Sequence, residues 1–364
     1  MSINRRRFVA VGIIAAGLGL AGAAAPARAD DVTLLETGSS LLYPLFNLWV
    51  PAYSQAHPGV KITTQSTGSG TGISEAVSGL AQIGASDAYL ADAMMKQHPD
   101  MLNIPLAISS QMVNYNLPGL NGDHLKLSGP VLAGIYQGKI KTWNDAAIAK
   151  LNPSVKLPDH PIITIHRTDG SGDTFIFTQY LSFSTPDWMN DIAYGTTISW
   201  PAAPGAIGAT GNQGMISALK GNEYSIAYIG ISFKKAIEDE KLGEAALENK
   251  AGKFVLSSAR TVQAAAASKI TDTPKDGRVS LIFAPGDDSY PIINYEYAIV
   301  KSRQSNAAAA STLKAFLSWA IAPDGGNQAS FLDQVSFVAL PEQVRQLSAT
   351  LINQIQGSGD EARQ

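Results

Sequence analysis

The sequence of 364 residues contains no cysteine. This absence excludes disulfides, zinc–thiolate sites, thiol nucleophiles and a lipid-modified N-terminal cysteine. Histidine is also scarce, and the five histidines are scattered rather than grouped in a metal-binding motif: His57, His98, His124, His160 and His166. We therefore expect no metal and no cofactor.

Residues 1–29 have the three parts of an export signal. Arg5–Arg7 form a basic start, Phe8–Ala25 form an apolar stretch, and Ala27–Ala29 match a cleavage site for signal peptidase. The arginines followed by Phe8 resemble a twin-arginine signal, and an ordinary Sec signal is the alternative. The apolar stretch is Gly-rich and falls short of a membrane span. We expect cleavage and release of a soluble protein into the periplasm.

Positive charge is scarce in the remaining chain. Removal of residues 1–29 takes away four of the 27 basic residues and none of the 30 acidic ones, which leaves a net charge of −7. This charge disfavours nucleic acid as a partner, because nucleic-acid-binding domains are strongly basic. A site for an anion would have to be built locally, from backbone amides, hydroxyl groups and a single arginine.

The pattern of residues 30–364 alternates short apolar runs with amphipathic segments, which predicts an α/β protein. The length exceeds one compact core, so two domains are expected. The predicted strands are Val32–Glu36, Val60–Gln65, Ile83–Ala85, Ser109–Tyr115, Ile162–His166, Ile226–Ile229 and Asn294–Val300. The predicted helices are Tyr43–Gln55, Ile73–Leu80, Val131–Tyr136, Trp143–Leu151, Thr174–Phe183, Met215–Lys220 and Thr312–Ala320. The polar tail Gly357–Gln364 is predicted to be disordered.

Three clusters of Gly, Ser and Thr lie where a predicted strand ends and a helix begins: Gly38–Leu41, Thr67–Gly72 and Asp169–Thr174. A helix N-terminus offers free amide groups and a partial positive charge, and such loops can hold an oxyanion. Helix caps and turns have the same composition, so each cluster alone leaves both interpretations open. The second cluster lacks the patterns of nucleotide-binding loops, which disfavours ATP or NAD.

Two acidic residues accompany these loops. Asp87 follows the predicted strand Ile83–Ala85, and Asp169 follows Arg167 by two positions. An ionised carboxylate only accepts hydrogen bonds. It can therefore accept from an anion that still carries a proton, and it would repel fully deprotonated sulfate. For Asp87, a turn or cap residue is the alternative interpretation.

At these positions the sequence resembles the phosphate-binding subunit of bacterial phosphate-specific ABC transporters. The likeness extends over nearly all of residues 30–364. The most specific strings are Arg167–Gly172 (RTDGSG) and Ile135–Trp143 (IYQGKIKTW). The shorter matches are Gly38–Leu41, Thr67–Gly70, Gly84–Asp87, Ile148–Pro153 and Leu340–Pro341.

The resemblance implies which residues contact phosphate. Hydroxyl donors are implied at Ser40, Ser69 and Ser171, and backbone amides at Leu41 and Gly172. Asp87 is implied to accept the phosphate proton, Arg167 to be the charged donor, and Asp169 to fix Arg167. Asp173 departs from the threonine of many relatives: its amide can donate, but its ionised side chain cannot.

The resemblance also implies the type II periplasmic binding-protein fold, an α/β architecture with two lobes, two hinge crossovers and a ligand cleft. Lobe one would comprise residues 30–114 and 291–364, and lobe two residues 115–290. The hinge strands would lie near Met112–Tyr115 and Ile292–Tyr295. The partners implied are inorganic phosphate and the permease subunits of an ABC importer with its cytoplasmic ATPase, and the protein is expected to act as a monomer.

Three other functions are compatible with parts of the sequence. A phosphoester hydrolase could use Ser69 or Ser171 as nucleophile and His166 as base, but no G-x-S-x-G motif occurs. The same fold could bind sulfate, molybdate or tungstate, or could serve adhesion or signalling. The interpretation we favour is a binding protein without catalytic residues.

Overall fold

The structure is a computed structural model that describes residues 32–358. These residues belong to one unit, Asp31–Gln364. The predicted export signal and the part of the predicted tail after residue 358 lie outside the described residues. The start of that tail is ordered, contrary to prediction, because Gly357 pairs with Gln304 at the edge of a small sheet.

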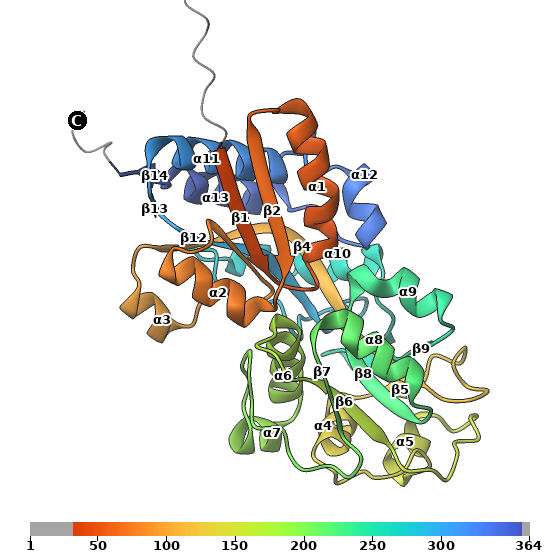
Figure 1. Cartoon of the computed structure of the whole chain (residues 1–364). Helices are drawn as coiled ribbons and strands as arrows, with labels where there is room; N and C mark the ends of the chain where they lie inside the picture. The colour runs from red at the N-terminus through yellow and green to blue at the C-terminus, as the bar shows by residue number, and fades with distance from the viewer. Residues whose placement is uncertain (1–31, 359–364) are drawn as a thin grey trace, which may run out of the picture. The chain divides into compact units, whose positions relative to one another are not determined.

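The main structural element is a mixed sheet of nine strands in the order β2-β1-β3-β12-β4-β8-β6-β7, with β9 also paired to β4 (Figure 1). Its strands are β1 (Val32–Gly38), β2 (Val60–Ser66), β3 (Ile83–Ser86), β4 (Met101–Asn116), β6 (Ile163–Arg167), β7 (Ile207–Ala209), β8 (Ser225–Gly230), β9 (Gly243–Glu244) and β12 (Ile293–Lys301). A small three-stranded sheet contains β5 (Lys126–Leu127), β10 (Ala246–Glu248) and β11 (Phe254–Val255). A two-stranded sheet contains β13 (Arg303–Gln304) and β14 (Gln356–Gly357).

Strand β4 connects the two ends of this sheet. From Met101 to Ser110 it pairs antiparallel with β12, and from Gln111 to Asn116 it pairs antiparallel with β8. All but the last of its 16 residues are buried, as expected for a strand covered on both faces. The sequence predicted only its second half, because Pro105 interrupts the apolar run and reads as a break.

The helices cover the sheet and follow the strands in alternation. They are α1 (Tyr43–Ala56), α2 (Ser69–Ser78), α3 (Asp92–Gln97), α4 (Gly129–Tyr136), α5 (Ala146–Leu151), α6 (Gly172–Ser184), α7 (Pro186–Asp191), α8 (Gly211–Gly221), α9 (Lys234–Asp239), α10 (Ala259–Ala267), α11 (Ala307–Ile321), α12 (Ala329–Leu332) and α13 (Glu342–Asn353). Three short 3₁₀ turns occur at Ile231–Phe233, Ile270–Asp272 and Asp333–Val335. Among residues 32–358, no helix combines the length and the apolar character needed to cross a membrane.

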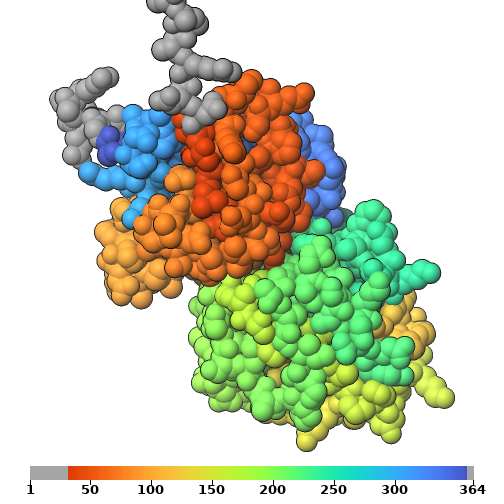
Figure 2. Space-filling model, viewed as in Figure 1, coloured from red at the N-terminus to blue at the C-terminus, as the bar shows by residue number. Residues whose placement is uncertain are grey.

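Helices α1 and α11 show how distant segments share one core. Phe46 of α1 packs against Phe316 of α11 with ring centroids 6.1 Å apart, and Tyr53 packs against Trp319 at 5.3 Å. Figure 2 accordingly shows the red and orange start of the described chain beside its blue end. Burial of these large rings supplies much of the hydrophobic driving force at this end of the sheet.

One predicted helix starts later than expected. Helix α5 begins at Ala146 and not at Trp143, because Asp145 caps it and accepts a hydrogen bond from the Ala147 amide at 2.8 Å. Trp143 is instead fully buried, and its indole nitrogen donates to the Tyr224 carbonyl at 2.9 Å. The α/β alternation predicted from the sequence is present from β1 to β4, whereas α6 and α7 follow one another directly and α11–α13 have no strand between them.

Candidate functional site

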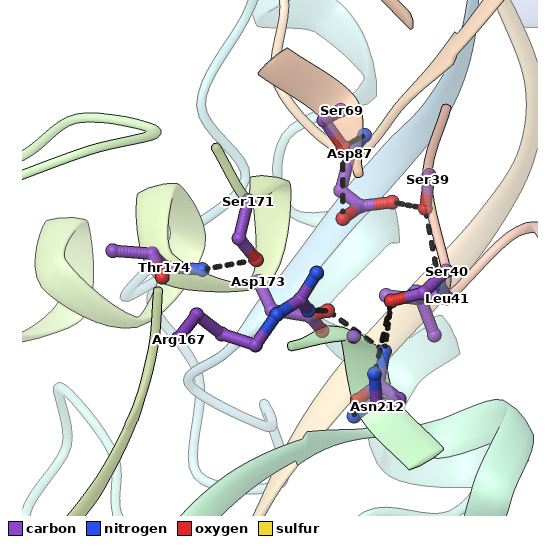
Figure 3. A network of polar contacts seen from close by, with 12 residues as sticks. Ser39, Ser40, Leu41, Ser69, Asp87, Arg167, Ser171, Asp173, Thr174 and Asn212 are labelled. Carbon is purple, nitrogen blue, oxygen red and sulfur yellow. Dashed lines mark hydrogen bonds and ion pairs between the residues drawn. The ribbon is translucent and has the colours of Figure 1, made fainter. Parts of the chain in front are cut away.

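The structure brings the predicted site residues together in one cluster, which is buried except at the half-buried Asp169, and Figure 3 labels most of its members. Ser40 and Leu41 follow β1, Ser69 starts α2, and Asp87 follows β3. From the other part of the sheet come Arg167 at the end of β6 and the residues that start α6: Ser171, Gly172 and Asp173. Strand ends and helix starts meet here, which is where open α/β sheets place their ligands.

Arg167 is held between two aspartates. Its Nε donates to Asp169 at 2.7 Å and its Nη1 donates to Asp173 at 2.6 Å, while Nη2 forms a second bond to Asp169. Burial alone would lower the pKa of Arg167, but the two carboxylates outweigh it and raise the pKa. Burial alone would raise the pKa of Asp169, but Arg167 holds it below its usual range. The guanidinium is thus charged and locally neutralised.

Asp173 stands where the sequence resemblance implied a threonine, and its side chain is fully engaged. Its Oδ2 also accepts from Asn212 Nδ2 at 2.8 Å, and its Oδ1 accepts from Gln111 Nε2 at 3.0 Å. Burial raises the pKa of Asp173 despite the stabilising charge of Arg167. A second carboxyl group therefore lies beside the single arginine.

Asp87 is 2% exposed and lies between two serines. The Ser39 hydroxyl bonds one carboxylate oxygen, and the Ser69 hydroxyl bonds the other at 3.3 Å. Burial and the charge of Asp173 raise the pKa of Asp87 to about 7, although Glu296, Ser39 and Arg167 act in the opposite direction. Asp87 can thus gain or lose a proton near neutral pH.

Two serine hydroxyls in the cluster accept hydrogen bonds and keep a proton to donate. Ser40 Oγ accepts from the Asn212 amide at 3.2 Å and from Asn212 Nδ2 at 2.9 Å. Ser171 caps α6, and its Oγ accepts from the Thr174 amide at 3.2 Å. Because a hydroxyl group can accept and donate at once, both serines can also donate to an oxyanion. The first amides of α6 have no partner within the helix.

Two close approaches explain glycines in the motifs. A Cβ atom on Gly172 would lie 2.3 Å from Asp87 Oδ2. The Gly70 amide donates to the Gly170 carbonyl at 2.8 Å, and a Cβ on Gly70 would lie 2.9 Å from the Gly170 Cα. Only glycine allows the backbone around α2 and α6 to come this near.

Four residues in or next to the cluster were missed by the sequence reasoning: Ser39, Gln111, Asn212 and Glu296. Ser39, and not its neighbour Ser40, bonds Asp87, and it also engages the Leu41 amide at 3.1 Å. Asn212 follows a strand-to-helix junction rich in glycine, a signal like that of the three recognised loops. Gln111 and Glu296 lie inside strands, where no local pattern marks a site residue.

The residues proposed for hydrolysis are not assembled as a nucleophile and base. His166 is half-buried and packs against Trp200 with ring centroids 5.1 Å apart. The hydroxyl groups of Ser69 and Ser171 contact Asp87 and the Thr174 amide, respectively. Within residues 32–358, no group of histidine and acidic residues is arranged to hold a metal ion.

Comparison with known proteins connects this geometry to a family. A family model described as a PBP superfamily domain matches residues 23–324. The phosphate-binding protein PstS of Pasteurella multocida is 36% identical over 314 residues, which cover 86% of this chain and 88% of the relative. The phosphate-binding protein PstS of Methanocaldococcus jannaschii is 33% identical over 346 residues, which cover 90% of this chain and 87% of the relative.

A solved structure supports the fold. A high affinity periplasmic phosphate-binding protein, determined with phosphate bound at pH 8.5, matches with a TM-score of 0.69 at 21% identity, over 88% of this chain and 93% of that protein. The predicted fold, a two-lobed α/β binding-protein fold, is confirmed by this likeness. Because the family match spans most of the sequence and identity exceeds 30% along most of both chains, the chain belongs to the PstS family of phosphate-binding proteins in the PBP superfamily.

Proposed function

We propose that this protein captures inorganic phosphate and delivers it to an ABC-type phosphate importer. The observation that carries the proposal is the buried cluster in which serine hydroxyls, helix N-termini and one arginine surround Asp87 (Figure 3). These donors suit a tetrahedral oxyanion and need no net positive charge. Family membership supports the same ligand, because the relatives are named phosphate-binding proteins.

The contacts to phosphate follow the residue types of the cluster. Ser40, Ser69 and Ser171 donate from hydroxyl groups, Leu41, Gly172 and Asp173 from backbone amides, and Arg167 from its guanidinium. In the described chain the Leu41 amide bonds Ser39 Oγ, so its contact with phosphate requires a small change of that loop. Asp169 orients Arg167 and reduces its charge.

Selectivity against sulfate rests on Asp87. The ionised carboxylate accepts a hydrogen bond from a protonated phosphate oxygen, whereas sulfate carries no proton at neutral pH and meets repulsion. Ser39 holds one carboxylate oxygen in place, so Asp87 cannot easily turn away from an unprotonated anion. The other oxygen accepts from Ser69 in the described chain. When Ser69 donates its single proton to phosphate, that oxygen becomes free to accept from the protonated phosphate oxygen.

The ligand would be enclosed by movement of two lobes, residues 30–114 with 291–364 and residues 115–290. The hinge would lie in β4 and β12 near Met112–Tyr115 and Ile292–Tyr295. Contacts of Ser40 with Asn212 and of Gly70 with Gly170 join segments from both lobes, so they would break on opening. The closed form would dock on the permease.

We further propose that the protein is exported, by the twin-arginine route, and acts in the periplasm as a soluble monomer. Its partners there would be the permease subunits, which work with a cytoplasmic ATPase. The basic start and apolar stretch of residues 1–29 support export.

Isothermal titration of residues 30–364 with phosphate and with sulfate tests the proposal. We expect tight binding of phosphate and no competition from equimolar sulfate at pH 8. Asp87→Asn is expected to weaken phosphate and to admit sulfate, since an amide can donate to it. Asp145→Asn, which changes only a helix cap far along the chain, serves as the control. Absence of phosphate binding contradicts the function, and unchanged selectivity in Asp87→Asn contradicts the role of that carboxylate.

A further inference from the structure

A second carboxyl group lies behind Asp87 in strand β12. Glu296 is fully buried, and β12 changes register against β4 between Glu296 and Tyr297. Such irregularities reorient side chains and are frequent next to functional sites. Glu296 belongs to none of the motifs that resemble the family, and the proposed phosphate contacts do not include it.

The hydrogen bonds around Glu296 indicate a protonated side chain. The Ser109 hydroxyl contacts Glu296 Oε1 and also lies 2.7 Å from Asn294 Oδ1. The orientation of Asn294 is fixed, because its Nδ2 donates to the carbonyls of Asp87 at 3.2 Å and Tyr295 at 2.9 Å. Ser109 therefore has one proton for two acceptors, and Asn294 Nδ2 also donates to Glu296 Oε1 at 3.1 Å. No donor is left for Oε2, so the proton of Glu296 lies on that oxygen.

Glu296 Oε2 is buried and receives no hydrogen bond from a donor among the described residues. A side-chain hydrogen bond joins the carboxyl groups of Glu296 and Asp87, which requires a proton on one of them. Burial, followed by the charge of Asp87, raises the pKa of Glu296 well above its usual range. Two neighbouring carboxyl groups in a buried site cannot both ionise at neutral pH. Asp87 has a donor on each carboxylate oxygen, Ser39 and Ser69, whereas both donors to Glu296 reach Oε1 and none reaches Oε2. Glu296 is therefore the one that keeps its proton.

We propose that Glu296 is a positioning residue that stays protonated behind Asp87 and thereby keeps Asp87 ionised, so that Asp87 can distinguish protonated phosphate from sulfate. The inference rests on the proposed function. The complex then holds two protons: one on Glu296, and one shared between Asp87 and a phosphate oxygen. The other charged groups facing Asp87 are Arg167 in β6 and Asp173 in α6.

The consequence concerns selectivity. If Asp87 is protonated, it becomes a donor and can bond sulfate. Sulfate is therefore excluded only at pH values above the pKa of Asp87, and Glu296 lowers that limit. A change at Glu296 is expected to move the pH at which sulfate begins to compete.

Two variants separate the proton of Glu296 from its shape. Glu296→Gln keeps a neutral donor, and we expect sulfate to begin to compete in this variant at the same pH as in the wild type. Glu296→Met has a similar length without a donor, and we expect the limit to rise by about one pH unit. Glu36→Gln is the matched control, because Glu36 is also a fully buried strand glutamate but has no contact with Asp87.

The assay is competition of sulfate against phosphate in calorimetry between pH 5 and pH 9. Loss of phosphate binding in the wild type contradicts the proposed function alone. An unchanged limit in Glu296→Met, or a limit that rises equally in Glu296→Gln, overturns the inference while phosphate binding persists.

If Glu296→Met does not fold, infrared spectra provide the decision. A protonated-carboxyl band at pH 7 that is present in Glu36→Gln and lost in the Glu36→Gln/Glu296→Gln double variant supports the inference. Its absence in Glu36→Gln refutes the inference.

Discussion

The departure at Asp173 yields the sharpest prediction about affinity. We expect Asp173→Asn to bind phosphate more tightly than the wild type at pH 8. The wild-type carboxylate lies 2.6 Å from Arg167 Nη1 and takes part of the positive charge that phosphate would otherwise meet. Removing it leaves Asp169 as the remaining counter-charge of the guanidinium.

The magnitude follows from two terms. Two unit charges about 6 Å apart interact by about 3 kcal/mol at an effective dielectric constant of 20. The wild type can avoid part of this repulsion by protonating Asp173, whose pKa is already raised by burial. Keeping Asp173 protonated costs about 1.4 kcal/mol for each pH unit above that pKa. The expected gain at pH 8 is therefore about 1–3 kcal/mol, or roughly five- to hundredfold.

The structure indicates that the variant keeps its fold. Gln111 Oε1 is buried without a partner. A flip of the Gln111 amide would let this oxygen accept a hydrogen bond from the side-chain amide that the substitution introduces. It would replace the bonds that Gln111 Nε2 now donates to Asp173 Oδ1 and to the Asp173 carbonyl. Because the difference in phosphate affinity between Asp173→Asn and the wild type arises from ionised Asp173, this difference is expected to shrink as the pH falls toward 5.

Calorimetric titration with phosphate at pH 5, 6, 7 and 8 measures this dependence, with Asp145→Asn as the control for an aspartate outside the cluster. Equal affinities of wild type and Asp173→Asn at pH 8 would refute the electrostatic reasoning. An affinity difference between the two proteins that widens as the pH falls would refute it as well.

Three further predictions concern single residues. Arg167→Ala is expected to lower phosphate affinity about tenfold or more, since a charged hydrogen bond contributes about 1.5–3 kcal/mol; unchanged affinity in calorimetry would exclude Arg167 from the site. Asn212→Ala removes the donor that bridges Ser40 and Asp173, and it is expected to lower both the phosphate affinity and the melting temperature. The control Ser217→Ala, on an exposed helix face, is expected to change neither, and equal effects of the two substitutions would contradict the bridging role of Asn212. Burial raises the pKa of Glu36, so the contribution of Glu36 to stability is full below its ordinary pKa and is lost as the pH rises. Glu36→Gln is therefore expected to raise the melting temperature at pH 8 more than at pH 5, and a variant that melts below the wild type at pH 8 would contradict this.

The site residues that could be predicted from sequence are those with local backbone signals. Ser69 and Ser171 stand beside glycines at strand-to-helix junctions, and helix starts expose amide groups whatever surrounds them. The clusters Thr67–Gly72 and Asp169–Thr174 therefore predicted helix starts, which the structure has at Ser69 and Gly172, and the oxyanion they would hold stays a prediction. Their mutual contact, Gly70 to Gly170, depends on the packing of two distant segments, and no local pattern specifies it.

The residues that were missed act through tertiary position. Gln111 and Glu296 lie inside buried strands, Gln111 directly after Ser109 and Ser110, and neither stands beside a glycine-rich turn or a helix start that would mark a site. Their partners, Asp173 and Ser109, come from other strands and helices. The full length of β4 was missed for a different reason: Pro105 cannot donate a ladder hydrogen bond, and the register of β12 shifts beside it.

The charges of the cluster are consistent with the selective binding of an anion that we propose for this protein of net negative charge. Arg167 is the single positive group, and Asp169 and Asp173 already neutralise it, so long-range attraction contributes little. Binding must then depend on short hydrogen bonds, which report where the ligand carries protons. A site rich in positive charge would hold phosphate and sulfate alike. Under the proposed function, the carboxyl groups around Arg167 reduce the long-range attraction for any anion, and the proton of the ligand then decides which anion binds.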